Sequence, residues 1–256
     1  MKLKIALRNL YISQAIILLF LLFAYIFWFP HSFAELGGFF DTAWMLIFVD
    51  LILGPLLVFL IYKENKKNLK FDINFLLSIQ LVAFIFGAYS LFLKHPAYAV
   101  FSNDRFILTN ISNIYPKPSK FDLLKNHFFS SPELVFAKLP ETTLERNNFI
   151  LSVSLKGEPD IESRPKYFKP LNTHIDKVLK KSINLKDLDL GNREQKILNS
   201  FFNKHKKDKH RFAYFSLSGN DKKEMIWVFD TKLAKPIEIL DINPWKLKPR
   251  FTKIIL

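Results

Sequence analysis

Long apolar runs occupy the first third of the chain, and short alternating runs occupy the rest. The apolar runs extend over residues 11–29, 43–62 and 73–93. Each holds about the 20 residues that an α-helix needs to cross the hydrocarbon layer of a membrane. Because lipid offers backbone groups no hydrogen-bond partners, each run is predicted to be a helix. The sequence therefore predicts a three-helix transmembrane bundle over residues 1–94.

Basic residues are distributed unevenly around these predicted spans. Lys2, Lys4 and Arg8 precede the first span, and four lysines lie between the second and third spans. The loop over residues 30–42 contains no Lys or Arg. Because cytoplasmic loops carry the excess of basic residues, the N-terminus is predicted to be cytoplasmic. Three crossings then place residues 95–256 on the opposite side of the membrane.

The first span has an alternative interpretation as a cleaved signal peptide. Ser32-Phe33-Ala34 has the small-x-small form of a signal-peptidase site and follows a basic start and an apolar run. The run is longer than the roughly 7 to 15 residues of a signal peptide's apolar region, which favours an uncleaved anchor. Both interpretations place the C-terminal domain on the same side of the membrane.

One acidic residue, Asp50, lies inside the second span. At ~1.5 Å of rise per residue it is about 10 Å below the outer interface, where a carboxylate costs roughly 2.5–3.5 kcal/mol to insert. Gly54 and Pro55 follow it, and the proline is expected to kink the helix. Together with Gln80 of the third span, these residues are candidates for contact with a partner's membrane helix. The alternative is that Asp50 bonds to Gln80 or another polar side chain and holds the bundle together.

Net charge changes at the end of the third span. The first 93 residues hold seven Lys or Arg against five Asp or Glu, so +12 of the chain's net charge of +14 belongs to the remainder. A basic domain tethered outside the cytoplasm is not expected to meet nucleic acid. Its lysines suit anionic lipid headgroups, an acidic protein surface or plain solvation equally well.

No catalytic, cofactor or metal site is predicted. The chain has no cysteine, which excludes disulfides, thiolate metal sites and cysteine nucleophiles, and its 7 glycines form no phosphate-binding loop. His205 and His210 are close in sequence, but the basic run Lys204–Arg211 around them disfavours a metal ion. The sequence does not show that carboxylates such as Glu141 and Glu145 lie close together in the fold.

Residues 95–256 are predicted to form an α+β domain with an antiparallel sheet. Three C-terminal runs separated by turn residues predict an antiparallel meander over residues 212–217, 225–229 and 236–240. Apolar spacing predicts a helix from near Asn172 to Ile183 and another after Gly191-Asn192.

The first part of this domain is predicted to be mostly extended. Residues 98–108 and 132–138 are strand candidates, rich in aromatic and branched residues. Thr142 and Glu145 have capping-box spacing, so a short helix is expected to begin there, and alternation over residues 149–155 predicts a strand after it. Prolines over residues 158–170 indicate an irregular segment.

Several motifs give the chain a resemblance to a known family. They are VDLILGPLL at 49–57, FSNDRF at 101–106, GEPDI at 157–161, SRP at 163–165 with Tyr167, and DINPW at 241–245. The chain resembles the type IV pilin accessory proteins of the bacterial inner membrane, the TfpX/TfpZ and FimB-like family. The resemblance covers most of residues 40–170. It marks a set of motif residues in the domain: Asp104, Arg105, Phe106, Glu158, Asp160, Arg164, Tyr167 and Trp245.

The resemblance implies a non-enzymatic role in assisting a type IV major pilin. It implies a multi-pass protein of the inner membrane with a periplasmic C-terminal domain, no cofactor, and the lipid bilayer and the pilin as partners. The second and third spans are expected to hold the pilin's apolar helix, and the domain to contact the pilin's globular head. The alternative is a membrane-anchored enzyme or sensor acting on pilin or cell-wall glycan. The enzyme would predict convergent carboxylates or histidines in a cleft.

Overall fold

The chain divides into two compact units. The computed structural model describes residues 2–30, 33–61, 69–130, 132–205, 211–219 and 223–246. The first unit, here the helical unit, comprises Met1–Pro96, Asn110–Ser112 and Ser119–Ser131. The second, here the sheet unit, comprises Ala97–Thr109, Asn113–Pro118 and Pro132–Leu256. Two later segments, Asn110–Ser112 and Ser119–Ser131, therefore group with the helices. The predicted division between residues 94 and 95 assigned both to the second domain.

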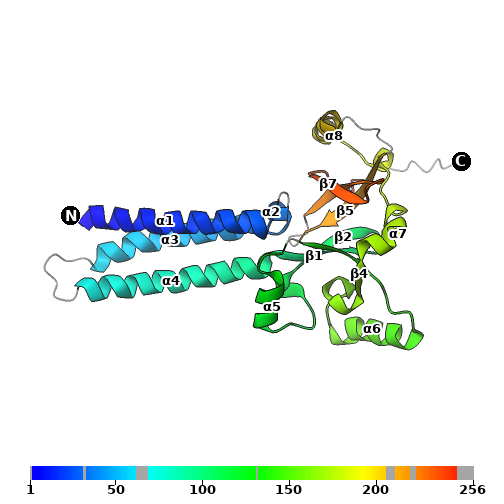
Figure 1. Cartoon of the computed structure of the whole chain (residues 1–256). Coiled ribbons are helices and arrows are strands. Elements are labelled where there is room, and N and C mark those ends of the chain that lie inside the picture. Colours follow the sequence, from blue (N-terminus) through cyan, green and yellow to red (C-terminus); the bar gives the residue numbers. More distant parts are fainter. Residues whose placement is uncertain are drawn as a thin grey trace, which may run out of the picture. The chain divides into compact units, whose positions relative to one another are not determined.

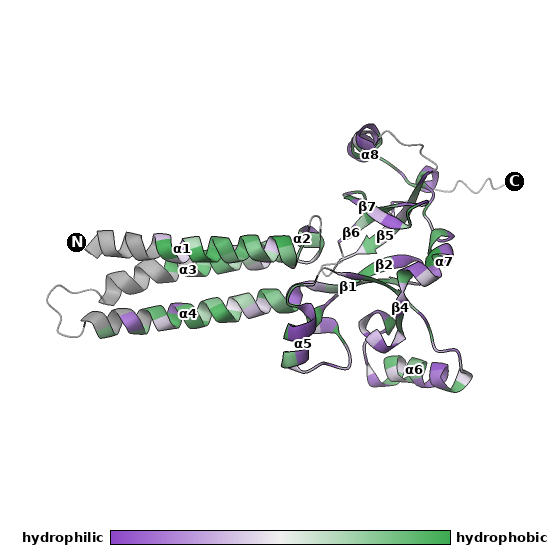
Figure 2. Ribbon diagram, viewed as in Figure 1, coloured by the Kyte–Doolittle hydropathy of each residue, from purple (hydrophilic) through white to green (hydrophobic). Residues whose placement is uncertain are grey.

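The helical unit is built around long apolar helices. Its helices are α1 (Lys2–Phe27), α2 (Phe33–Leu36), α3 (Phe39–Ile61), α4 (Leu69–Lys94) and α5 (Lys120–His127). Helix α3 packs against both α1 and α4, and Figure 1 shows the three running side by side. Hydrophobic residues dominate the described parts of these helices (Figure 2). Helices are thus confirmed at all three predicted positions.

Only part of this apolar length meets a strict criterion for a membrane span. Within the described residues, Leu77–Lys94 is long and apolar enough to cross a membrane, and Tyr11–Phe27 and Phe39–Val49 are shorter apolar helices. Crossing by all three helices stays a prediction. Ser32 of the possible cleavage site lies outside the described residues, so the signal-peptide alternative stays open as well.

Helices α3 and α4 approach each other closely at one glycine. A Cβ atom at Gly87 of α4 would lie 2.1 Å from Cδ2 of Leu46 on α3, a buried side chain. Near the end of the same helix, the Lys94 ammonium donates to the Thr42 hydroxyl over 2.9 Å. The pair α3–α4 is therefore fixed by a steric fit and by a polar bond.

The described strands form one mixed sheet in the order β4-β3-β1-β2-β5-β6-β7. Their bounds are β1 Pro96–Ser102, β2 Arg105–Asn110, β3 Glu133–Ala137, β4 Phe168–Pro170, β5 Phe212–Ser218, β6 Glu224–Asp230 and β7 Lys235–Leu240. The antiparallel meander β5-β6-β7 is confirmed. The prediction of an antiparallel sheet is wrong for the sheet as a whole, because β1 pairs with β3 in parallel and β2 pairs with β5 in parallel. Parallel neighbours need long crossover connections, and here helices supply them.

Helices α6 (Thr143–Lys156), α7 (Ile175–Leu179) and α8 (Asn192–His205) belong to the sheet unit. Short 3₁₀ turns lie between the larger elements: η1 Ile111–Asn113, η2 Ile161–Ser163, η3 Pro165–Tyr167, η4 Leu171–His174 and η5 Leu185–Asp187. Helix α8 starts where predicted and packs Leu198 and Phe201 against Phe212, Tyr214 and Val228 of the meander. The predicted helix near Asn172 is shorter than expected, because α7 ends at Leu179.

Two strand predictions in the first half of the sheet unit are wrong. Residues 98–108 form two strands, β1 and β2, because the chain turns at Asn103, whose φ of 58° breaks the extended run. Residues 149–155 belong to helix α6. There the apparent alternation arose because Leu151 and Leu155 are exposed apolar residues, whereas Phe149 and Ser152 form the buried face at helical spacing.

Candidate functional site

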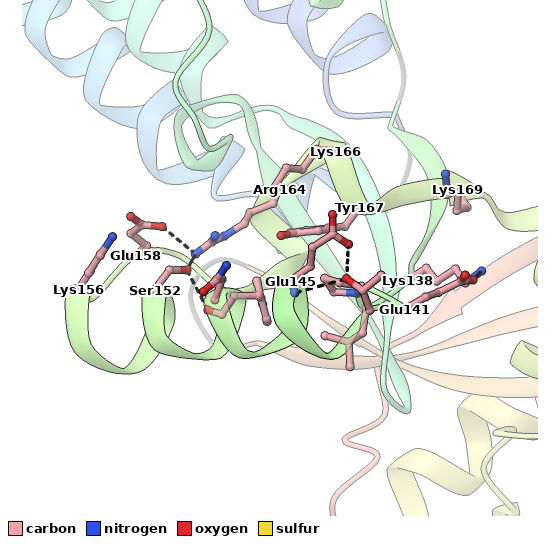
Figure 3. A pocket seen from close by; sticks show the side chains of 15 residues that line it. Lys138, Glu141, Glu145, Ser152, Lys156, Glu158, Arg164, Lys166, Tyr167 and Lys169 are labelled. Atoms are coloured by element: carbon pink, nitrogen blue, oxygen red, sulfur yellow. Dashed lines mark hydrogen bonds and ion pairs between the residues drawn. The ribbon is translucent and has the colours of Figure 1, made fainter.

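A cleft in the sheet unit gathers several of the predicted motif residues. Its cavity is about 830 Å³ and is lined by helix α6, the segment before it and the segment after it. Glu158, Arg164 and Tyr167 of the motif line it together with Lys138, Glu145 and Ser152 (Figure 3). We call this cavity the motif cleft.

The caps of helix α6 shape the motif cleft. At its start, the Thr142 hydroxyl accepts from the Glu145 backbone N–H and donates to the Glu145 carboxylate over 2.9 Å, so Thr142 is the N-cap and the predicted helix start is confirmed. At its end, Gly157 takes a left-handed conformation with a φ of 64°, which glycine adopts without steric cost. The chain then reverses at Asp160, whose carboxylate accepts from the Ile161 N–H over 2.6 Å. The segment over residues 158–169 therefore returns alongside the helix.

Arg164 is the buried cation of the motif cleft, with 3% of its surface exposed. Its Nε donates to the Pro159 carbonyl over 2.7 Å, and its Nη2 donates to the Ser152 hydroxyl over 2.9 Å. A Glu158 carboxylate oxygen lies 3.3 Å from the same Nη2. The Phe149 ring faces the guanidinium at 4.9 Å. A buried charge is tolerated when it is paired and hydrogen-bonded, so Arg164 ties helix α6 to the returning segment.

The carboxylates of the motif cleft each have a structural partner. Glu141 pairs with Lys138, and this ammonium holds the pKa of Glu141 below its ordinary value. The Glu145 carboxylate accepts from the Thr142 hydroxyl, and the Glu158 carboxylate pairs with Arg164. A general acid at neutral pH needs a raised pKa, which a carboxylate paired with Lys138 does not have. Among the described residues, no group of three or more His, Asp or Glu is placed to hold a metal ion.

Lysines give the motif cleft a cationic rim. Lys156, Lys166 and Lys169 line it, and the Lys166 ammonium lies 4.7 Å from the centre of the Tyr167 ring. Sequence reasoning did not single out these lysines, Lys138 or Ser152. Lysine is common along the whole chain, so only the fold distinguishes those that gather here from the rest.

Three other motif residues, Asp104, Arg105 and Trp245, form a second cluster that does not line the motif cleft. Asp104 and Arg105 lie at the turn between β1 and β2, with 2.9 Å between the Arg105 Nε and the Asp104 carboxylate. The Arg105 guanidinium stacks 4.3 Å from the ring centre of Trp245, which is 140 positions further along the chain. Phe106 is fully buried beside Trp227 and belongs to the core of the sheet unit.

The predicted membrane residues lie on two different helices. Asp50, Gly54 and Pro55 are in α3, which continues through the proline to Ile61, and their side chains lie outside the described residues. Gln80 of α4 lines an apolar groove of about 420 Å³. We call it the α1–α4 groove; its other lining residues are Ile12, Ser13, Ile16, Ile17, Leu77, Leu81 and Phe84.

The basic run Lys204–Arg211 is partly outside the described residues, including His210. At its two ends the cations are paired. Lys204 and His205 contact the Glu238 carboxylate at 2.9 and 3.0 Å, and Arg211 pairs with the buried Asp230 at 2.9 Å. These residues connect the end of α8 and the start of β5 to the neighbouring strands.

Comparison with known proteins gives a partial match to proteins of Dichelobacter nodosus. The chain is 34% identical over 80 residues to a "Fimbrial assembly protein, serogroup I". It is 33% identical over 79 residues to those of serogroup E1 and of serogroups C1 and C2. The chain is thus similar to fimbrial assembly proteins.

The match is limited in length. Each matched segment covers 30% of this chain, 31% of the serogroup I and E1 proteins and 60% of the C1 and C2 protein. No family model matches the chain, and no solved structure matches it.

Proposed function

We propose that this chain is a non-enzymatic accessory protein of the bacterial inner membrane that binds a type IV pilin and assists its assembly into pili. The observation that carries the proposal is the similarity to fimbrial assembly proteins. The motif residues described above support it through their resemblance to pilin accessory proteins. The engaged carboxylates of the motif cleft favour binding over catalysis.

The membrane placement in this proposal rests on the helical unit. Helices α1, α3 and α4 would form the three-helix transmembrane bundle, with the N-terminus in the cytoplasm and the sheet unit in the periplasm. Large apolar side chains on their outer faces support this, among them Leu19 and Val82, each 67% exposed, and Phe86, 72% exposed. In water such a surface would favour aggregation, whereas lipid solvates it.

The α1–α4 groove is the proposed contact for the pilin's membrane helix. A pilin before assembly is anchored by one apolar N-terminal helix, with its globular head outside. Leu77, Gln80, Leu81 and Phe84 recur at helical spacing on one face of α4 and face α1 across the groove. An apolar helix laid into such a groove is a common mode of recognition. This moves the expected contact from the second and third spans to the first and third.

The motif cleft is the proposed contact for the pilin's head. Its lysine rim suits an acidic surface, because complementary charge fixes register and speeds association. The proposal therefore gives each part of the pilin one contact: the α1–α4 groove for its membrane helix and the motif cleft for its head.

Site-directed photo-crosslinking in cells tests the proposal. A photo-reactive amino acid placed at Leu81, in the α1–α4 groove, should give a covalent adduct with the pilin. The same residue placed at Val82, one position along α4 and 67% exposed outside the groove, is the matched control and should give little adduct. Equal yields at both positions, or no adduct from Leu81, at equal protein levels would contradict the proposal.

A further inference from the structure

Helix α5 is fixed to the ends of α1 and α4 within the helical unit. The Trp28 indole N–H donates to the Phe128 carbonyl over 2.7 Å, and Trp28 is 2% exposed. The Phe128 ring contacts Trp28 and Phe92, with ring centres 5.7 and 6.2 Å apart. On α5 itself, Leu123 faces inward and is 2% exposed. A segment far along the chain is therefore anchored where the long apolar helices finish.

The opposite face of α5 exposes large apolar side chains. Phe121 is 73% exposed, Leu124 43%, and Phe129, just beyond the helix, 72%. The Phe129 ring lies 6.1 Å from that of Phe23 and 6.3 Å from that of Phe27, near the end of α1. Phe27 is itself 43% exposed. The exposed face of α5 thus continues the outward apolar surface of α1.

Cations accompany this apolar face. Lys120 and Lys125 belong to α5, and the Lys120 ammonium lies 5.9 Å from the ring centre of Tyr89 on α4. Lysines that flank an apolar face with aromatic residues are the composition of helices that lie in a membrane interface. Aromatic residues also concentrate at the level where transmembrane helices end.

We propose that α5 is an interfacial helix that inserts Phe121, Leu124 and Phe129 into the boundary between headgroups and acyl chains of the outer, periplasmic leaflet. Lys120 and Lys125 then contact anionic headgroups. The inference rests on the membrane placement in the proposed function. Continuity with the lipid-facing surface of α1 favours lipid over a protein as the occupant of this face.

Spin labelling of the full chain in liposomes containing anionic lipid, without pilin, tests the inference. Because the chain has no cysteine, a nitroxide attached to one introduced cysteine reports a single position. Labels at Phe121→Cys and Phe129→Cys should relax more with dissolved oxygen than with a water-soluble nickel chelate. Phe86→Cys on α4, 72% exposed, is the control for lipid, and Leu144→Cys on α6, 73% exposed, is the control for water.

The controls separate failure of this inference from failure of the proposed function. If Phe86→Cys reports lipid while Phe121→Cys and Phe129→Cys favour the nickel chelate as Leu144→Cys does, the interfacial helix is refuted and the bundle stands. If Phe86→Cys also favours the chelate, the membrane placement itself is refuted. Protection of the α5 labels only when pilin is added would overturn the lipid assignment in favour of a protein contact.

Discussion

The two units differ in how their described phenylalanines are exposed: both bury some rings, Phe29 among them in the helical unit, but the largely exposed rings all lie in the helical unit. In the sheet unit, Phe106 and Phe215 are fully buried, with their ring centres 5.6 Å apart. In the helical unit, Phe71 and Phe86 are each 72% exposed. A domain in water gains stability by burying such rings, whereas a helix in lipid gains nothing by hiding them. Under the proposed membrane placement, the composition of the chain reflects two solvents, water and lipid, and 28 Phe in one sequence do not indicate one unusually large core.

Buried polar groups differ between the units as well. In the sheet unit, buried Arg164 meets hydrogen-bond acceptors and a carboxylate. In the helical unit, His95 is fully buried and stacks on Trp28 with 5.6 Å between ring centres. Its Nδ1 lies 2.8 Å from the Phe92 carbonyl, and its Nε2 has no hydrogen-bond partner in the part of the chain that is described. Hydrogen bonds and the Glu158 carboxylate offset the cost of burying the Arg164 charge, whereas burial of His95 favours its neutral form.

The largest expected effect comes from removing matched rings in the two units. Phe106→Ala should destabilise the sheet unit by about 3–5 kcal/mol, because it leaves a cavity in a fully packed aromatic cluster. Phe86→Ala should change stability by about 0.5 kcal/mol or less, since that ring is exposed. Denaturant unfolding in detergent, followed by near-ultraviolet circular dichroism, measures both. Similar losses of stability for the two variants would contradict the proposed difference between the phenylalanines of the two units.

Much of each unit could be predicted from local patterns. Apolar runs located α1, α3 and α4, and turn residues between short runs located β5, β6 and β7. The parallel pairing of β2 with β5 could not be predicted, because the strands are separated by about a hundred residues and nothing local specifies which partner a strand takes. Helix α6 could have been recognised, since Thr142 and Gly157 are strong start and stop residues and outweigh a short alternation.

The candidate sites also show that contacts between residues close in sequence could be predicted and contacts between distant segments could not. Motif residues close in sequence, Glu158, Arg164 and Tyr167, do line one cleft. The contact of Arg105 with Trp245 and the contact of Trp28 with Phe128 join distant segments. The burial of Trp28 against Phe128 depends on the tertiary fold, because nothing in the sequence around Trp28 specifies this distant partner.

A second, smaller effect is a pH dependence of the helical unit through His95. Burial lowers the pKa of His95 to about 4 from an ordinary value of 6.5. Between these two values the unfolded chain binds a proton that the folded chain does not, so stability falls as pH falls below 6.5 and is constant above it. The full difference is roughly 3 kcal/mol. Burial also lowers the pKa of His127, which adds to the same trend.

Thermal unfolding in detergent at pH 7 and pH 4.5 measures this effect. His95→Gln should remove most of the difference between the two pH values, and the part due to His127 should remain. His174→Gln is the matched control, because His174 stacks on Phe136 in the sheet unit, away from this cluster. A pH dependence that keeps its full size in His95→Gln, or disappears in His174→Gln, would show that the buried imidazole of His95 is not its main source.

The smallest expected effect tests the cap that shapes the motif cleft, and it should be confined to the sheet unit. Gly157→Ala should cost about 1 kcal/mol, because a Cβ at a φ of 64° strains the backbone although open space surrounds it. Gly157→Asn should cost less, since asparagine tolerates the left-handed conformation. Unfolding of the sheet unit measures the pair. If alanine and asparagine cost the same, the loss comes from the added side chain and not from the backbone, and the returning segment does not depend on this cap.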